Sequence, residues 1–182
     1  GTLRALYDNE RKNTLTALPL VHLGLALSLQ GDKARGGKAI EEGFAFKGDR
    51  PGYLWDYGSP LRDRSLMIAL THEHGTPRAA WDATAMDVAR DLELRRGRAY
   101  GRLYLSTQEQ IALARLGKAL AAAQGKRVSG TLVEGEVEQV LPEARMIGRS
   151  YGYDALAKGV RFDPKGELPL FVNIDVAGVP TT

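Results

Sequence analysis

The 182-residue sequence predicts an α+β protein in which all the helices precede the strands. Over residues 3–124 the apolar side chains recur at helical spacing, and from residue 127 onward they alternate as in strands, most clearly over 168–176. A doubly wound sheet would need strands and helices in alternation. We therefore expect antiparallel helical hairpins over residues 1–125, followed by a small antiparallel β region over residues 126–182.

The composition is typical of a folded globular protein, with 43% hydrophobic and 26% charged residues. Lysine and arginine exceed aspartate and glutamate by 25 to 22, and the charges are interleaved along the predicted helices. This pattern favours solvated helix faces over a nucleic-acid-binding surface. No apolar run reaches membrane-spanning length. The absence of cysteine excludes disulfides, cysteine zinc sites and a thiol nucleophile within this stretch.

Two helices are expected after a short helical turn at residues 3–7. Thr16 is placed to cap the first, which runs to about residue 30 with a proline in its first turn. This helix is apolar nearly all round, so we expect it to be buried, with His22 as a hydrogen-bonded core residue. Asp32 caps the second, over 33–46. Its glycines indicate either close packing against a neighbour or a frayed helix: Gly36, Gly37 and Gly43.

Three further helices are marked by their first residues. Ser59 and Pro60 open a helix that ends near residue 75, and another is expected over 77–95. Ser106 with Glu109 forms a capping box that opens the last helix. The helix over 77–95 carries one apolar stripe, formed by Trp81, Ala85, Val88 and Leu92, and the last helix carries the apolar residues Ile111, Leu113, Leu116 and Leu120.

The β region is expected to hold strands at 128–133, 137–141, 159–162 and 168–176. Asp163-Pro164-Lys165-Gly166 has the composition of a turn, so the last two strands should pair as a hairpin. Residues 134–135 give a weaker turn signal between the first two.

No side chain pattern identifies an active site. His72 and His74 lie two residues apart near a helix end, which places them on different faces, whereas zinc-binding helices space their histidines by four. The helix macrodipole explains their position. We assign no catalytic, cofactor-binding or metal-ligating residue, and no cofactor.

Two sets of residues leave other functions open. Asp56 and Asp63 near one helix start, and Glu41-Glu42 on another helix, could supply the carboxylate pair of an α/α-barrel glycosidase or lyase, or could serve as caps. The aromatic set Tyr53, Trp55 and Tyr57 could line a sugar or peptide groove on a helical repeat scaffold, or could pack over helix ends.

Several segments, in the same order along the chain, resemble the thioester-domain region of bacterial α2-macroglobulins. They are the turn Leu3–Asp8, the leucine-rich helix that ends Gln30-Gly31-Asp32-Lys33-Ala34-Arg35, the segment Asp56-Tyr57-Gly58-Ser59-Pro60-Leu61-Arg62-Asp63, the helix start Leu105-Ser106-Thr107-Gln108-Glu109, and the strand Leu168-Pro169-Leu170-Phe171-Val172 with Gly178-Val179-Pro180 behind it.

This resemblance implies that residues 1–125 are the C-terminal part of an α/α toroid and that residues 126–182 belong to the adjoining CUB-like β domain. The chain would then be a fragment of a much longer, periplasmic or surface-exposed protein that traps proteases without catalysis of its own. Its partners would be target proteases, bound through the full-length parent, and the remainder of the parent chain. It would bind no nucleic acid and contribute no membrane span.

The sequence departs from the family pattern at its reactive group. The thioester motif Cys-x-Glu-Gln is absent, and the nearest approach, Thr107-Gln108-Glu109-Gln110, has threonine in place of cysteine. A threonine ester lacks the activated acyl sulfur, and Glu109 already has an expected role in the capping box. We therefore predict that this segment starts a helix and carries no thioester.

Overall fold

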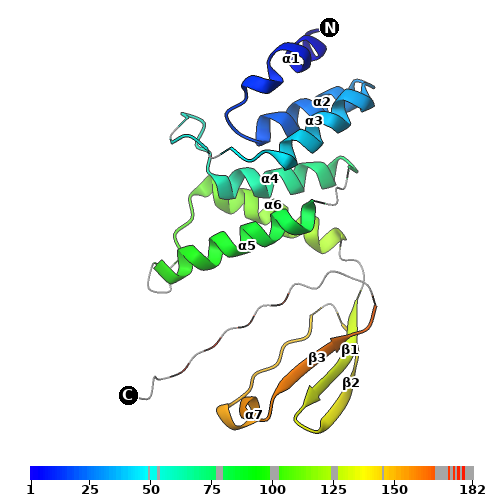
Figure 1. Cartoon of the computed structure of the whole chain (residues 1–182), viewed down its shortest axis with the longest axis vertical. Coiled ribbons are helices and arrows are strands. Elements are labelled where there is room, and N and C mark those ends of the chain that lie inside the picture. Colours follow the sequence, from blue (N-terminus) through cyan, green and yellow to red (C-terminus); the bar gives the residue numbers. More distant parts are fainter. Residues whose placement is uncertain are drawn as a thin grey trace. The chain divides into compact units, whose positions relative to one another are not determined.

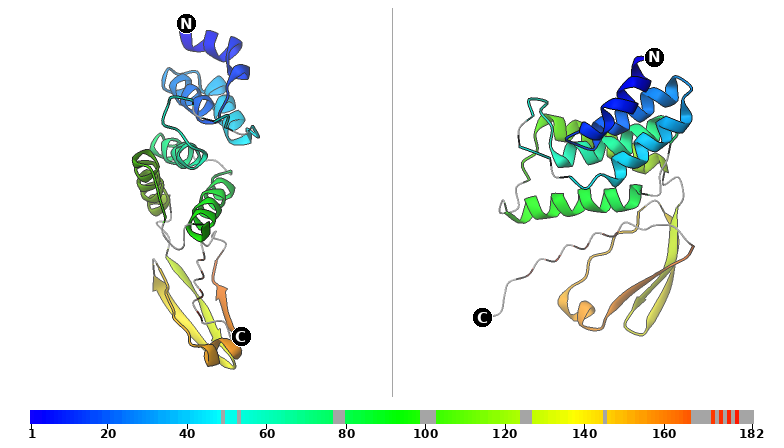
Figure 2. Two further views of the ribbon diagram at one scale, coloured as in Figure 1. Left: turned by 90° about the vertical axis from the view of Figure 1, so that its left-hand side faces the viewer. Right: turned by 45° about the horizontal axis from the view of Figure 1, so that its top comes forward.

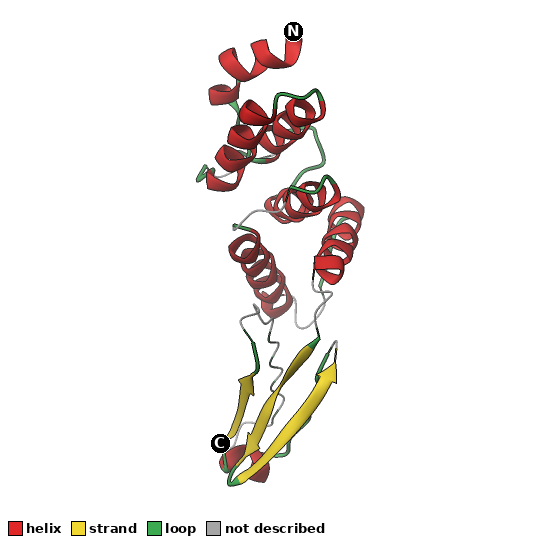
Figure 3. Ribbon diagram, turned by 90° about the vertical axis from the view of Figure 1, so that its right-hand side faces the viewer, coloured by secondary structure: helices red, strands yellow, loops and turns green. Residues whose placement is uncertain are grey.

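The computed structural model of the chain describes residues 1–182 except 49, 53, 77–79, 99–102, 124–126, 145, 167–171, 173, 175, 177 and 179–182, and it leaves out the side chains of residues 97, 98 and 123. The chain divides into two compact units, Gly1–Ala123 and Gln124–Thr182. The first is helical, and the second contains a small antiparallel sheet (Figures 1 and 3). The predicted α+β class, with helices before strands, is confirmed.

The helical unit contains six α-helices and one 3-10 turn among its described residues. They are α1 (Thr2–Asn9), η1 (Arg11–Asn13), α2 (Leu18–Leu29), α3 (Lys33–Ala45), α4 (Pro60–Glu73), α5 (Trp81–Arg98) and α6 (Thr107–Ala123). Helices α2 and α3 lie side by side, and α4 packs against α2, α5 and α6 (Figure 2). Helix α4 is therefore the central element of this unit.

The start of α2 differs from the prediction. Its N-cap is Ala17, not Thr16, and Pro19 lies in the first turn as expected. Thr16 is buried, and its backbone carbonyl accepts a hydrogen bond of 2.8 Å from the Thr14 hydroxyl. The expectation of burial on all sides was also wrong, because both His22 and Leu29 are exposed. A helix that is apolar all round in sequence here still keeps one face in solvent.

Glycines bring α2 and α3 into close contact. A Cβ atom added at Gly36 would lie 2.6 Å from the carbonyl oxygen of Gly24, and one added at Gly24 would lie 2.6 Å from that of Gly36. A Cβ at Gly43 would lie 2.9 Å from a methyl group of Val21. The packing interpretation is therefore confirmed for Gly36 and Gly43. Asp32 caps α3 as predicted, accepting a hydrogen bond from the backbone N–H of Arg35.

The main hydrophobic cluster lies between α4, α5 and α6. Its buried members are Leu61, Ile68, Trp81, Ala85, Val88 and Leu116, with Leu92, Leu113 and Leu120 packed against them. The predicted stripe of α5 is thus confirmed. Of the apolar residues noted on α6, Ile111 is 52% exposed. Helix α5 begins at Trp81 and ends three residues beyond the predicted end, and the expected start at Pro77 lies outside the described residues.

The sheet unit consists of β1 (Val128–Glu134), β2 (Val137–Ala144) and β3 (Val160–Pro164), in the order β2-β1-β3. Both pairs are antiparallel. The turn between β1 and β2 is confirmed, with Gly135 at a positive φ of 62°. A short helix, α7 (Tyr153–Ala157), precedes β3 and was not predicted.

The turn predicted at residues 163–166 was placed too early in the sequence, because β3 continues to Pro164. Asp163 and Pro164 belong to β3 and pair with β1, where they lie opposite Thr131 and Gly130. The predicted strand 168–176 and its hairpin lie largely outside the described residues. The described residues of that segment are exposed and in no strand: Val172, Ile174 and Val176.

Candidate functional site

Helices α4 and α6 begin next to each other and share a cap. Ser59 is the N-cap of α4, and its Oγ accepts a hydrogen bond of 3.1 Å from the backbone N–H of Arg62. The same hydroxyl donates a bond of 2.7 Å to Oε1 of Glu109 in α6. Glu109 also completes the predicted capping box, because Oε2 accepts from the Ser106 N–H at 3.0 Å and the Glu109 N–H donates to Ser106 Oγ at 3.3 Å. Two helix starts are therefore held by one carboxylate.

The Glu109 carboxylate is buried but stays ionised. The residue is 5% exposed, and Nη1 of Arg95 in α5 donates to Oε1 at 2.8 Å. Burial would raise the pKa of Glu109, but the hydrogen bonds from Ser59, Ser106 and Arg95 outweigh it and lower the pKa. Arg95 is fixed in turn by Asp91, at 3.0 Å. This arrangement orders three helix ends and leaves Glu109 poorly suited to donate a proton.

A second cluster of charges supports the loop before α4, and we call it the arginine–aspartate cluster: Arg50, Asp56, Arg62 and Asp63. Arg50 donates to Asp63 at 2.8 Å and pairs with Asp56. Arg62 donates to Asp63 at 2.8 Å and to the backbone carbonyl of Asp56 at 2.8 Å. The Arg50 side chain is only 6% exposed. The loop is thus bound to α4 through its own charged residues.

This pairing bears on the carboxylate pair suggested by the sequence. The hydrogen bond from Arg50 is the main reason that the pKa of Asp56 is lowered. The general acid of a glycosidase needs the opposite shift. Of the two acidic residues on α3, Glu41 is exposed, and Glu42 accepts a hydrogen bond of 3.2 Å from Arg11. The geometry therefore gives Asp56 and Asp63 a structural role.

The loop also presents aromatic side chains to solvent. Trp55 is 84% and Tyr57 72% exposed, while Tyr53 lies outside the described residues. Trp55 and Tyr57 have positive φ angles of 59° and 52°, which are uncommon for residues other than glycine. Between them, Asp56 accepts a hydrogen bond of 3.0 Å from the Gly58 N–H. Most of the surface of these two side chains is therefore exposed to solvent.

The three histidines occupy separate places. His72 lies beside Trp81 with ring centroids 5.5 Å apart, and His74 is the C-cap of α4. His22, expected in the core, is exposed; burial of part of its ring and the charge of Arg62 lower its pKa. Within the described part of the chain, no three histidine, aspartate or glutamate side chains gather as a metal site requires.

The segment Thr107–Gln110 is occupied by the helix start. Thr107 is exposed at the first position of α6, and Glu109 makes the contacts given above. The Gln110 side chain donates a hydrogen bond of 2.9 Å to the backbone carbonyl of Leu105. The capping role predicted for this segment is confirmed by these bonds.

Sequence reasoning missed the two arginines that organise these clusters. Arg50 and Arg95 lie 13 and 14 residues from their buried partners Asp63 and Glu109. Residues that far apart in the sequence are not neighbours on one helix, so helical spacing does not predict that they pair.

Comparison with known proteins identifies the family. No family model matches the chain. An alpha-2-macroglobulin of Xylella fastidiosa is 55% identical to it over 181 residues, or 99% of this chain. The chain belongs to the bacterial alpha-2-macroglobulin family. It spans 11% of the length of that alpha-2-macroglobulin.

Solved alpha-2-macroglobulins contain the same fold. The Salmonella protein reacted with methylamine matches 78% of this chain with a TM-score of 0.58 and 31% identity, over 8% of its own length. The trypsin-activated protein of Escherichia coli matches 78% of this chain with a TM-score of 0.57 and 28% identity, over 9% of its own length. Among the described residues, no helix of this family member is long and apolar enough to cross a bilayer.

Proposed function

We propose that this chain is a non-catalytic segment of an alpha-2-macroglobulin that traps proteases in the periplasm or at the bacterial surface. The observation that carries the proposal is the 55% identity to an alpha-2-macroglobulin over 99% of the chain. In this proposal residues 1–125 are part of the α/α toroid of a thioester domain, and residues 126–182 are part of a CUB-like domain.

The contacts of the polar residues support a structural role. Glu109 joins the starts of α4 and α6, and Arg95 links it to the end of α5. Asp63, the other buried acid of this region, is paired with Arg50 and Arg62. Both carboxylates are held in ion pairs with arginines, and the hydrogen bonds that lower the pKa of Glu109 make it a poor proton donor. We infer that this segment acts as a rigid scaffold when the parent protein changes conformation to trap a protease.

Two of the solved relatives suggest which activities to test. One was solved after reaction with methylamine, and another after activation by trypsin. Reaction with a small amine is expected of an activated acyl group, and activation by a protease is expected of a trap triggered by cleavage. We extend both properties to the full-length parent of this chain, with the reactive acyl group in another part of the parent.

The test uses the full-length parent. Trypsin is incubated with a molar excess of the parent, and its activity is measured on a large protein substrate and on a small peptide substrate. A trap should suppress cleavage of the protein while sparing cleavage of the peptide. Unchanged cleavage of the protein substrate would refute the proposal. Methylamine treatment should release one thiol if the parent carries a thioester, so thiol titration tests whether the reactive acyl group proposed for the parent is present.

A further inference from the structure

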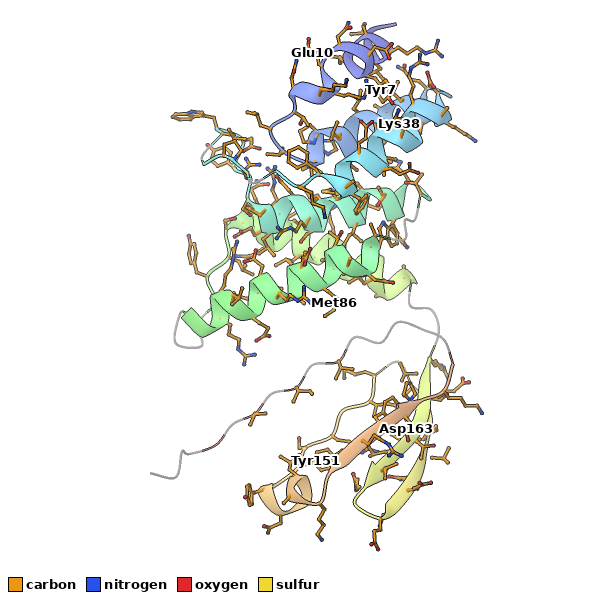
Figure 4. The ribbon with its side chains drawn as sticks, viewed as in Figure 1. Tyr7, Glu10, Lys38, Met86, Tyr151 and Asp163 are labelled. Atoms are coloured by element: carbon orange, nitrogen blue, oxygen red, sulfur yellow. The ribbon has the colours of Figure 1, made fainter. Side chains whose placement is uncertain are left out.

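The loop before α4 exposes residue types that proteases recognise. Trp55 is 84% and Tyr57 72% exposed, and Figure 4 shows side chains that project outward from this loop. Chymotrypsin accepts large apolar and aromatic side chains in its hydrophobic S1 pocket and cleaves the bond that follows them. Exposed loops are also the usual sites of proteolytic nicking. Composition and exposure alone would therefore make this loop easy to cleave.

The backbone of the loop does not have the conformation that a protease binds. An extended peptide can pair its main chain with a partner strand and place alternate side chains in pockets. Trp55 and Tyr57 instead have φ angles of 59° and 52°, in the left-handed region. Between them, the Asp56 carboxylate accepts a hydrogen bond of 3.0 Å from the Gly58 N–H and closes a turn. The loop must therefore open before a protease can cleave it.

Arg50 holds the loop in this conformation. Its guanidinium donates to Asp63 of α4 at 2.8 Å and pairs with Asp56, so it joins the loop to the first turn of the helix. The Arg50 side chain is buried, and it passes so close to Gly58 that an added Cβ would lie 2.5 Å from Nη2. Arg62 adds a second link, a bond of 2.8 Å to the backbone carbonyl of Asp56.

Opening of the loop would break these contacts. Arg50 would lose its acidic partners, and separating a buried pair of charges is costly because each charge is left poorly compensated. Local opening has a free energy between nearly zero, for mobile loops, and the full free energy of unfolding. Where opening is fast compared with cleavage, the rate of proteolysis follows the population of the open form. The ion pairs of Arg50 should therefore slow cleavage of the loop.

We propose that the arginine–aspartate cluster is a latch that protects the loop before α4 from proteolysis. The latch keeps Trp55 and Tyr57 in a backbone conformation that a protease active site does not bind. Its use in the parent rests on the proposed function, because a trap has to hold a protease that still cleaves small peptides without losing this loop. The latch itself is a property of the chain, so it is tested separately from trapping.

The test measures cleavage by chymotrypsin, in the full-length parent and in the 182-residue chain. The protease is added beyond the amount that the parent could capture, and the products are quantified by mass spectrometry. Cleavage after Trp55 or Tyr57 reports opening of the loop. Cleavage after Trp81 reports wider unfolding, because this side chain is buried and its indole N–H donates to Thr71 at 3.0 Å.

Arg50→Gln removes both ion pairs that Arg50 makes in the latch. We expect cleavage after Trp55 or Tyr57 to become at least about tenfold faster, while cleavage after Trp81 stays within about twofold. Asp63 keeps Arg62 as a partner, which limits the effect on the rest of the helical unit.

Two further variants complete the test. Asp56→Asn should also speed cleavage of the loop, by a smaller factor, because the amide oxygen can still accept the Gly58 bond but no longer carries the charge that faces Arg50. This variant decides the question if Arg50→Gln does not fold. Arg115→Gln is the matched control, since it breaks the ion pair with Glu73 between α6 and α4 and leaves the loop untouched. It should not change the rate of loop cleavage.

Three results would overturn the proposal. The loop of Arg50→Gln could stay as resistant as that of the unmodified protein, or Arg115→Gln could speed loop cleavage equally. In the third case, cleavage after Trp55 and after Trp81 would rise together, and the cluster would then support only global stability. Failure of trapping would appear elsewhere, as unchanged cleavage of the large protein substrate by trypsin, and the loop rates would still decide whether the latch exists.

Discussion

The hydroxyl of Ser59 donates a 2.7 Å hydrogen bond to the carboxylate of Glu109, fifty residues further along the chain. Each residue also caps its own helix, so the caps of α4 and α6 form a single unit. Local capping and tertiary packing are therefore coupled in this protein. A change at Glu109 should affect both.

Replacement of Glu109 by glutamine tests this coupling. The amide can still accept a bond from Ser59, but it loses the charge that faces Arg95 in a buried position. We expect the free energy of unfolding to fall by about 2 kcal/mol, since removing one member of a buried pair leaves its partner poorly compensated. Arg95 keeps Asp91 as a second partner, which limits the loss. Urea unfolding of the chain, followed by circular dichroism, measures the change.

The control for this variant is Glu93→Gln. Glu93 is an exposed acid on α5, so its replacement removes the same charge without a buried contact. We expect a change within about 0.5 kcal/mol, as for most surface substitutions. Equal losses from both variants would show that net charge, and not the shared cap, accounts for the effect of Glu109.

The lowered pKa of Glu109 also predicts a pH dependence. A carboxyl group with a lower pKa in the folded state binds its proton less tightly there than in the unfolded chain. Its contribution to stability is therefore fully present above the unfolded pKa, near 4.3, and is lost as the pH falls through the folded pKa. Other acids titrate in the same range. The informative quantity is the stability difference between the original chain and Glu109→Gln, which should stay nearly constant from pH 6 down to the unfolded pKa and shrink as the pH is lowered further toward 3. A difference that stays constant over this range would contradict the charge argument.

Replacement of Ser106 by alanine removes the other half of the capping box. The Glu109 N–H loses its side-chain acceptor, and we expect a loss of about 1 kcal/mol of stability. Thr107→Ala, one residue further on, removes a hydroxyl from an exposed position and serves as the control. Neither change should affect protease capture by the full-length parent at temperatures where it is folded. Loss of capture by a stable Ser106→Ala parent would give this segment a direct functional role.

The helix starts that could be predicted are those set by local chemistry. Asp32, Ser59 and Ser106 with Glu109 were identified because a capping residue bonds to the backbone only two or three positions away. Thr16 is also a residue type that commonly caps helices. In the structure, however, α2 begins at Leu18, its N-cap is Ala17, and no side chain caps it.

The buried positions of α6 were harder to predict than the helix starts. The buried positions of α6 are Glu109, Ala112, Leu116 and Ala119, which follow helical spacing. Alanine and a charged residue give a weak hydrophobic signal, so the apolar residues noted on this helix include the exposed Ile111 and leave out three of its four buried positions. The arginine contacts of the candidate site could not be predicted, because Arg50 and Arg95 find their partners only when separate helix ends come together.

Two glycine-to-alanine substitutions, one at the α2–α3 contact and one in α6, should change the stability of the chain in opposite directions. Gly36→Ala should destabilise the chain by about 1–3 kcal/mol, because the new methyl group would collide with the Gly24 carbonyl and the Ser28 side chain, and this outweighs the better helix propensity of alanine. Gly117→Ala in α6 has open space around the added Cβ, so propensity should prevail and stabilise the chain by up to about 1 kcal/mol. The two substitutions are chemically identical, and both are made within a helix. A difference in sign between their urea midpoints can therefore come only from the contact between α2 and α3, and stabilisation by both would mean that this contact is looser than the structure shows.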